Sequence, residues 1–277
     1  MGYNIQAASD SKHKLLVEFE TGNVNDTHAL AQMATAAKEI LKAEAMDVLA
    51  DKGYHTGEEL KKCEVENITA YVSPKAPATP DNGLYPVTAF TYNKSDDTYT
   101  CPAGEILRTN NVWYKHSGKG RTEAYRFLRY TTPACKTCES RSKCTAGEKN
   151  GRAIDRSEYA PAIEANRERV TANPEYYRLR QQITEHPFGT LKRQRGFTFT
   201  LMKGKTKVLG EVGLEFIGYN LVRCATILGL AELCKALKRC CLSFFGHLFW
   251  LISGFFKPSY FEPPDRINYS ANKLLPA

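Results

Sequence analysis

Several signatures of common enzyme classes are missing from the 277 residues of this chain. There is no glycine-rich phosphate loop, no G-x-S-x-G sequence and no H-E-x-x-H pair, which argues against NTPases, serine hydrolases and zinc metalloproteases. No cationic segment followed by an apolar stretch precedes the first polar residues, and the nine cysteines are an odd number. A secreted, disulfide-bonded scaffold is therefore not expected, and reduced thiols fit the cytoplasm.

Long hydrophobic runs are also scarce. The most apolar stretch, residues 240–256, has 17 uncharged residues but contains Gly246, His247 and Gly254. It lies just below the usual length of a transmembrane helix. We expect a buried or partner-docking terminal helix here, and a membrane-associated protein anchored by residues 240–256 is the alternative.

What the chain does have is an uneven distribution of charge. Lys and Arg number 38 and Asp and Glu 30, which gives a net charge of +8. Residues 1–100 hold 9 basic and 15 acidic side chains, whereas residues 101–210 hold 22 and 10. Because clustered positive charge is the electrostatic footprint of nucleic-acid binding, the middle third is predicted to bind a polyanion.

The first 70 residues follow an α/β pattern. Strand-type residues on both sides of a polar turn at residues 10–13 predict an antiparallel hairpin. Apolar residues at three- and four-residue spacing predict a helix over 26–43, and a short apolar run predicts a strand over 46–50. A helix over 56–63, with Thr56 as its N-cap, follows. This order indicates a mixed sheet with helical crossovers.

The remaining chain divides into a strand-poor and a helical part. Proline and glycine clusters break residues 71–157 into short pieces, which indicates an inserted, loop-rich module. Helix is predicted from near Pro161 to Arg193 with an interruption at Pro174, and again over 207–239. The predicted domains are thus residues 1–70, 71–157, 158–240 and a tail over 241–277.

Two carboxylates are candidate metal ligands. Asp51 directly follows a predicted strand, where α/β sheets place functional groups. Glu185 lies on a predicted helix, and helical spacing places it in one stripe with Tyr177, Arg180 or Gln181, and Lys192. A turn aspartate and an ordinary solvated helix face are the alternative interpretations. Because Mg²⁺ and Mn²⁺ prefer carboxylate oxygens, the pair predicts a site for one of these ions.

Positive charge surrounds these two carboxylates, so a phosphodiester is the natural substrate. The side chains expected to bind DNA are Tyr177, Arg180, Lys192, Arg193, Arg195, Lys203 and Lys205. None of them indicates a preference for a particular base sequence.

Four cysteines share the loop-rich region with the spacing C-x33-C-x2-C-x5-C. A C-x2-C pair is the usual bite for tetrahedral Zn²⁺, and two further thiolates can complete a closed structural site. Such a site would supply folding free energy where the core is small. Separate reduced cysteines are the alternative, since the other two spacings match no standard zinc finger. The four are Cys101, Cys135, Cys138 and Cys144.

Several segments together resemble the DDE transposases of bacterial insertion sequences. Residues 2–17 look like the family's second and third strands, residues 48–54 like the segment with its second catalytic aspartate, and residues 185–193 like the helix with its catalytic glutamate. The spacings Tyr177-x2-Arg180 and Glu185-x6-Lys192 fit the Y-x2-R-x3-E-x6-K signature, although Arg180 here precedes Glu185 by five positions instead of four.

The cysteine segments at residues 101–104 and 135–138 are similar to an insertion present in one subgroup of that family. The resemblance implies an RNase H-like mixed sheet flanked by helices and interrupted by the insertion, with Asp51 and Glu185 as catalytic ligands of Mg²⁺. It also implies metal-dependent phosphodiester hydrolysis and strand transfer in DNA transposition. The implied partners are the insertion-sequence ends, target DNA and further copies of the intact protein, in the bacterial cytoplasm.

One departure from the family concerns its first catalytic aspartate, which lies on a strand upstream of the hairpin that starts here at Gly2. Asp10 is the nearest acid, but it falls in the hairpin turn. We therefore expect a transposase fragment that lacks one of three metal ligands. A non-catalytic nucleic-acid-binding remnant or regulator is the alternative.

Overall fold

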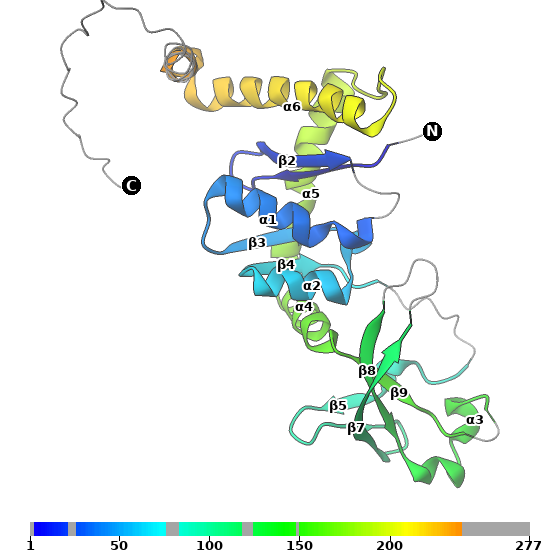
Figure 1. Cartoon of the computed structure of the whole chain (residues 1–277). Helices are drawn as coiled ribbons and strands as arrows, with labels where there is room; N and C mark the ends of the chain where they lie inside the picture. The colour runs from blue at the N-terminus through cyan, green and yellow to red at the C-terminus, as the bar shows by residue number, and fades with distance from the viewer. Residues whose placement is uncertain (1–2, 22–25, 76–82, 118–123, 148–149, 240–277) are drawn as a thin grey trace, which may run out of the picture. The chain divides into compact units, whose positions relative to one another are not determined.

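The computed structural model describes residues 3–21, 26–75, 83–117, 124–147 and 150–239 (Figure 1). Contacts divide the chain into two units, Met1–Asn220 and Leu221–Ala277. The predicted tail at residues 241–277 and the apolar stretch at 240–256 lie outside the described residues.

The chain begins with the predicted hairpin, β1 (Ile5–Ser9) and β2 (Leu16–Thr21), which pair antiparallel. The Asp10 carboxylate accepts hydrogen bonds from the backbone N–H groups of Lys12, His13 and Leu15 at 2.9, 2.8 and 2.9 Å. A short acidic side chain that satisfies three backbone donors stabilises the tight turn. Asp10 therefore serves the turn, as its position in the sequence indicates.

The next helix begins later than predicted. Residues Asp26–His28 form a 3-10 turn (η1), and α1 covers Leu30–Leu41. The buried carboxylate of Glu59 accepts a hydrogen bond from the Ala31 N–H at 2.8 Å and so caps the first turn of α1. Because this cap comes from 28 residues away, it leaves no signal at the start of the helix itself.

A parallel pair of strands follows. Strand β3 (Met46–Ala50) matches the predicted strand, and a 3-10 turn, η2 (Lys52–Tyr54), and helix α2 (Gly57–Val65) lead to β4 (Ile68–Val72). Thr56 occupies the N-cap position of α2, as predicted, but its side chain makes no capping hydrogen bond. Its hydroxyl instead donates to the Thr27 carbonyl at 3.0 Å and ties α2 to the segment before α1.

The inserted segment holds a small antiparallel sheet in the order β5-β6-β7-β8-β9. Short helical turns connect the strands, and five buried side chains from the sheet and its edges form its core: Phe90, Tyr99, Leu107, Tyr130 and Ile154. The elements are η3 (Val87–Ala89), β5 (Thr91–Asn93), β6 (Thr98–Thr100), β7 (Ile106–His116), β8 (Tyr125–Thr131), η4 (Pro133–Lys136), α3 (Arg141–Cys144) and β9 (Ile154–Ser157).

The described residues after β9 are mainly helical. Helix α4 (Ala160–Ala172) ends before Pro174, which opens α5 (Pro174–Gly189) at the position where a missing N–H costs nothing. A π-helical turn, η5 (Thr190–Gln194), precedes α6 (Lys205–Leu228). The prediction of one helix over 207–239 is wrong: Gly229 has φ of +82°, and the following helix Leu230–Arg239 turns away by 120°.

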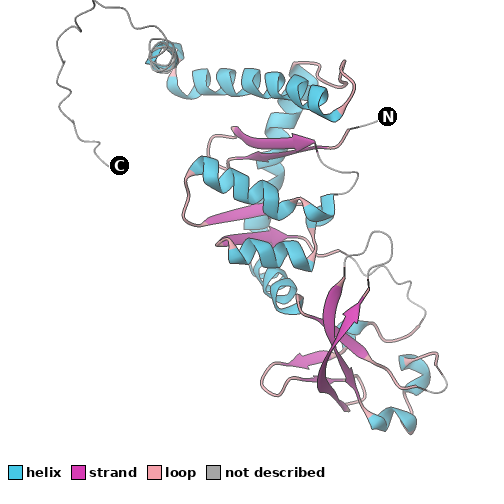
Figure 2. Ribbon diagram, in the orientation of Figure 1, coloured by secondary structure: helices cyan, strands magenta, loops and turns pink. Residues whose placement is uncertain are grey.

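In the first unit, helices cover both faces of the strands. Helices α1 and α2 pack on one face, and α5 runs along the other face past both β1 and β3 (Figure 2). This is the mixed α/β, RNase H-like arrangement that was predicted. Among the described helices, none is long and apolar enough alone to span a membrane, whereas α6 and the helix after it pass that test only as a bent pair.

Candidate active site

The outer edges of the two small sheets are closed by asparagine side chains. Asn166 on α4 accepts from the Val72 N–H at 2.9 Å and donates to the Val72 carbonyl at 2.7 Å. Asn220 on α6 makes the same pair of bonds with Leu16, at 2.9 and 2.8 Å. Each amide thus replaces a neighbouring strand, and it satisfies both backbone groups that such an edge exposes.

The inner edges of the two sheets, on β1 and β3, are not closed in this way within the described residues. In the described part of the chain β1 pairs only with β2 and β3 only with β4, so the remaining edges of β1 and β3 both lack a strand partner. Both line one groove of about 480 Å³. Its walls come from α1, with Met33, Ala34 and Ala37, and from α5, with Ile183 and Phe188. The strands expected to form one sheet therefore stand on two sides of an apolar groove.

Asp51 lies at the carboxyl end of β3, at one limit of this groove. Its side chain is 59% exposed, and one oxygen accepts from the Lys52 N–H at 2.7 Å. This bond caps η2 and leaves the other carboxylate oxygen directed elsewhere. Asp51 thus caps a turn with one oxygen and offers a second, exposed oxygen that can bind a metal ion.

Arg180 on α5 faces that second oxygen, because its Nη1 atom lies 3.9 Å from Asp51 Oδ2. The guanidinium also stands over the ring of Tyr177 at 5.8 Å, and the Tyr177 hydroxyl donates to the Ala50 carbonyl at 3.1 Å. Arg180, and not Gln181, therefore shares the site with Asp51. Its Nε atom is buried and has no hydrogen-bond acceptor within the described residues.

A second carboxylate near Asp51 was not singled out as a site residue. Asp26 accepts from the Asn4 amide at 2.6 Å, and a Cβ at position 53 would lie 3.2 Å from Asp26 Oδ2, so Gly53 allows the close approach. Burial, followed by the charges of Asp26 and Asp51, raises the pKa of the nearby Tyr54 to about 12. The sequence shows Asp26 only as a helix cap, because its partners are remote along the chain.

Glu185 is exposed on α5, immediately after Thr184, which lines the groove. The next residue, His186, holds the helix in place: its Nδ1 lies 2.9 Å from the Tyr219 hydroxyl, which itself donates to the Lys14 carbonyl at 2.8 Å. Since that hydroxyl proton is already used, His186 Nδ1 carries the hydrogen of the first contact. The helix segment carrying Glu185 is therefore anchored to the hairpin.

These side chains do not by themselves complete a metal site. Across residues 3–21, 26–75, 83–117, 124–147 and 150–239, no group of three or more His, Cys, Asp or Glu side chains is arranged to hold a metal ion. Asp51 offers the oxygen chemistry that Mg²⁺ prefers, but it stands beside a cation and not beside two further carboxylates.

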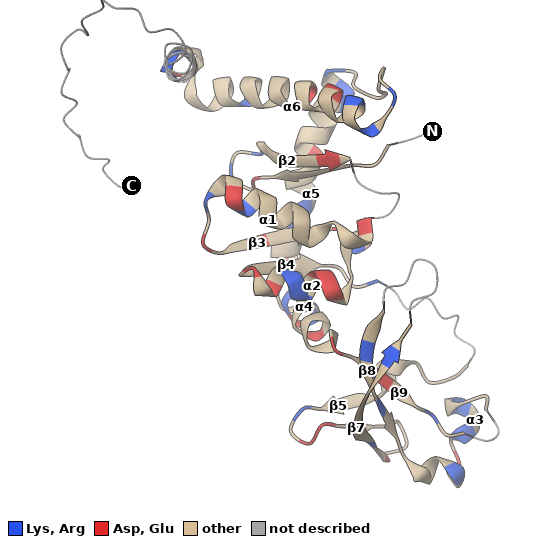
Figure 3. Ribbon diagram, in the orientation of Figure 1, with Lys and Arg blue, Asp and Glu red and all other residues tan. Residues whose placement is uncertain are grey.

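Two of the predicted DNA-binding residues, Tyr177 and Arg180, lie on α5, and the other five follow it in the chain. Lys192 and Arg193 are exposed on η5, and Lys203 and Lys205 lie where α6 begins, where Figure 3 shows Lys and Arg gathered. Arg195 is already engaged, because it donates to the Gly218 carbonyl at 2.8 Å and lies 3.8 Å from Glu215.

Comparison with known protein families gives a match over residues 100–225, to the family described as transposase DDE domain. Residues 100–225 thus match a DDE transposase domain. The match covers β7, β8 and β9 of the small antiparallel sheet, α4, α5 with Glu185, and most of α6. No curated protein and no solved structure matched.

DDE transposases bind DNA and depend on a divalent metal ion such as Mg²⁺. The match starts after Asp51, which it therefore does not include, whereas Glu185 lies inside the matched residues. The family also accounts for the excess of positive charge in residues 101–210.

Proposed function

We propose that the chain forms part of the catalytic centre of an insertion-sequence transposase, with Asp51 and Glu185 as ligands of Mg²⁺ or Mn²⁺. The observation that carries the proposal is Arg180, whose guanidinium lies 3.9 Å from Asp51 while its buried Nε has no acceptor. A donor of this kind beside a groove suits a phosphate oxygen. When bound, the metal ion supplies charge stabilisation to the attacking and leaving oxygens of a phosphodiester.

The remaining residues then have defined tasks. Tyr177 holds both Arg180, through its ring, and the end of β3, through the Ala50 carbonyl, so it orients Arg180 toward the phosphate. Lys192, Arg193, Lys203 and Lys205 extend the positive surface along the DNA backbone, and Arg195 keeps the start of this stretch attached to α6.

A third carboxylate is needed, and the groove supplies a place for it. We propose that an additional β-strand lies between β1 and β3, pairs with both inner edges, and carries an acidic residue next to Asp51. Three features support this: the outer edges are closed by Asn166 and Asn220, both inner edges line the same groove, and its walls are apolar. Five extended residues span about 17 Å, the length of β3.

The test is Mg²⁺-dependent cleavage of DNA that contains the sequences flanking the coding region, at a fixed low salt concentration and with the strand-forming segment supplied. Asp51→Asn and Glu185→Gln are each expected to lower the cleavage rate by about 10²-fold or more, since several kcal/mol of charge stabilisation are lost. Asp47→Asn, on the same strand, and Glu175→Gln, on the same helix, are matched controls that retain the rate.

The alternative is a nucleic-acid-binding module without catalysis, and the absence of a three-ligand metal group in the described residues favours it. This alternative predicts salt-dependent DNA binding with no cleavage at any Mg²⁺ or Mn²⁺ concentration, even when the strand-forming segment is supplied. Equal cleavage by Asp51→Asn and the unaltered chain would exclude the catalytic proposal.

A further inference from the structure

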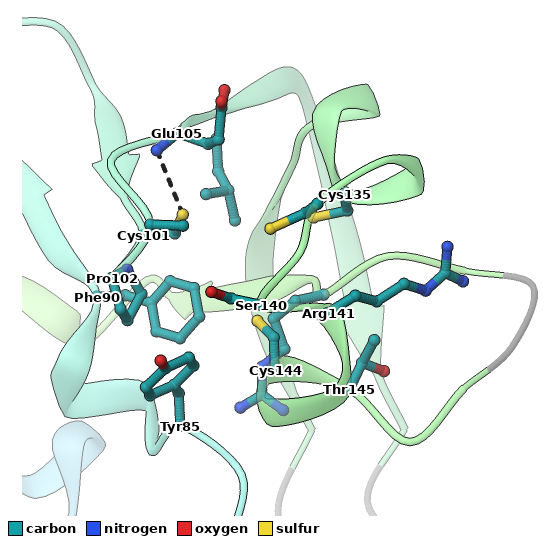
Figure 4. Close-up of a pocket in the computed structure, with 14 residues that line it drawn as sticks. Tyr85, Phe90, Cys101, Pro102, Glu105, Cys135, Ser140, Arg141, Cys144 and Thr145 are labelled. Carbon is teal, nitrogen blue, oxygen red and sulfur yellow. Dashed lines mark hydrogen bonds between the residues drawn. The ribbon is translucent and has the colours of Figure 1, made fainter.

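Four cysteines that are dispersed in the sequence line one small cavity in the antiparallel-sheet module. Cys101 follows β6, Cys135 and Cys138 lie on and just after η4, and Cys144 ends α3. All four border a cavity of about 20 Å³, together with Phe90 and Arg152. Figure 4 shows Cys101, Cys135 and Cys144 around this space. All four are free thiols.

We propose that this cavity is a structural Zn²⁺ site with Cys101, Cys135, Cys138 and Cys144 as its ligands. The volume accommodates one ion or water-sized particle. Four sulfur ligands with no oxygen donor select tetrahedral Zn²⁺ over Mg²⁺. This inference is independent of the proposed catalytic centre, which lies at the other sheets.

The loop at Cys101 already has the form of a metal-binding turn. The Glu105 N–H points at the Cys101 sulfur at 3.3 Å, and the Gly104 N–H bonds the Cys101 carbonyl at 2.9 Å. Gly104 has φ of +86°, which the tight turn requires. The Glu105 N–H is thus placed to donate to a metal-bound sulfur at position 101.

The opposite wall is equally constrained. A Cβ at position 151 would lie 2.5 Å from Cys135 Cβ and 3.1 Å from its sulfur, so the chain before β9 packs directly on this ligand. The neighbouring Arg152 has a buried Nε without an acceptor in the described residues. Zn²⁺ with four thiolates carries a net charge of −2, which a guanidinium at this position complements.

The thiols do not yet meet in coordinating geometry, because the described residues contain no ready-made metal group. Ion binding is expected to rotate the sulfurs inward while releasing four protons. The need for such a cross-link follows from the small core of the module, whose buried cluster has five side chains.

The experiment uses the full chain, purified without chelators, with metal content measured by mass spectrometry. We expect one zinc per chain, and replacement by Co²⁺ should give the sulfur-to-metal charge-transfer and d–d bands of a tetrahedral thiolate site. Cys138→Ser should abolish these bands and lower the zinc content at least tenfold, whereas Cys224→Ser, a cysteine on α6 outside the cavity, should change neither.

Cys138→Ser removes a proposed ligand and can thereby prevent folding, so a second measurement uses the unaltered chain. Titration of its thiols with an organomercurial should release the zinc in proportion to four thiols. The proposal is overturned if the chain binds no zinc, if Cys138→Ser keeps its zinc, if iron occupies the cavity, or if the four cysteines are found as two disulfides.

Discussion

At the residue scale, two asparagine side chains form hydrogen bonds with the outer strands, β2 and β4, of the two small sheets. Asn166 is fully buried and forms paired hydrogen bonds with Val72, and Asn220 does the same for Leu16. A helix side chain thereby performs the task of a strand. Nothing about an asparagine in a helix predicts this, since its partner lies 94 residues away in one case and 204 in the other.

Replacing Asn166 by leucine leaves the Val72 N–H and carbonyl buried without partners. We expect the free energy of unfolding to fall by about 2–4 kcal/mol, because each unsatisfied backbone group costs roughly 1–3 kcal/mol. Denaturant unfolding of the purified chain measures this. Gln182→Ala is the control, since Gln182 is exposed within α5 and the change should alter stability by less than about 0.5 kcal/mol. Equal effects of the two substitutions would contradict the edge-closing role.

In the candidate site, too, some residues could be recognised from their neighbours in the sequence and others only from the folded structure. Asp51 could be identified from the sequence because an acid after a short apolar strand is a local pattern. Its contact with Arg180 followed in part from helical spacing, which left Gln181 as an equal choice until the structure placed Arg180 against Asp51. Asp26 could not be recognised, since Asn4 and Gly53 define its surroundings only after folding.

At the scale of elements, the hairpin, β3 and the break at Pro174 could be predicted because turn residues, an apolar run and a proline each act locally. The late start of α1 and the separation of the sheet into two pairs could not, since both depend on packing between distant segments. Gly229, with its positive φ, ends α6. The sequence contains this glycine, but the apolar periodicity continues on both sides of it and so predicted one continuous helix.

Two glycines make the packing of helices testable. A Cβ at Gly57, the first residue of α2, would lie 2.6 Å from Tyr159 Cβ, whereas a Cβ at Gly210 within α6 meets no atom within 4 Å. Gly57→Ala should destabilise the chain by about 1–3 kcal/mol through overpacking. Gly210→Ala should stabilise it by up to about 1 kcal/mol, because alanine favours helix.

Thermal or denaturant unfolding of the two variants side by side provides the check. Both changes add one methyl group to a helix, so the comparison isolates the contact with Tyr159 from helix propensity. A stabilised Gly57→Ala variant would mean that α2 and the segment at Tyr159 are not packed as described.

At the scale of the whole molecule, the positive charge gathers where the DDE domain is expected to meet DNA, and its salt dependence tests that role. Each phosphate contact contributes about −0.9 to the slope of log affinity against log salt concentration. Changing Lys192, Arg193, Lys203 and Lys205 together to alanine should therefore make the slope shallower by about 3–4.

Binding of a DNA duplex of arbitrary sequence, titrated over a range of salt concentrations, gives both slopes. Arg126→Ala with Arg129→Ala is the matched control, because these cations are already held by Glu158 and Asp155. The control should leave the slope almost unchanged. A loss of slope in the control and not in the four-residue variant would move the DNA interface to the β7–β8 hairpin.

The groove between β1 and β3 has a consequence for how such a protein can be regulated. If the proposed strand occupies the groove that both edges line, it satisfies both edges together, so occupancy behaves as a single on–off event. An enzyme built in this way can be divided at that seam into two inactive pieces that regain activity on mixing. A short extended peptide that binds in the same groove would take the place of the proposed acidic strand and so inhibit the enzyme.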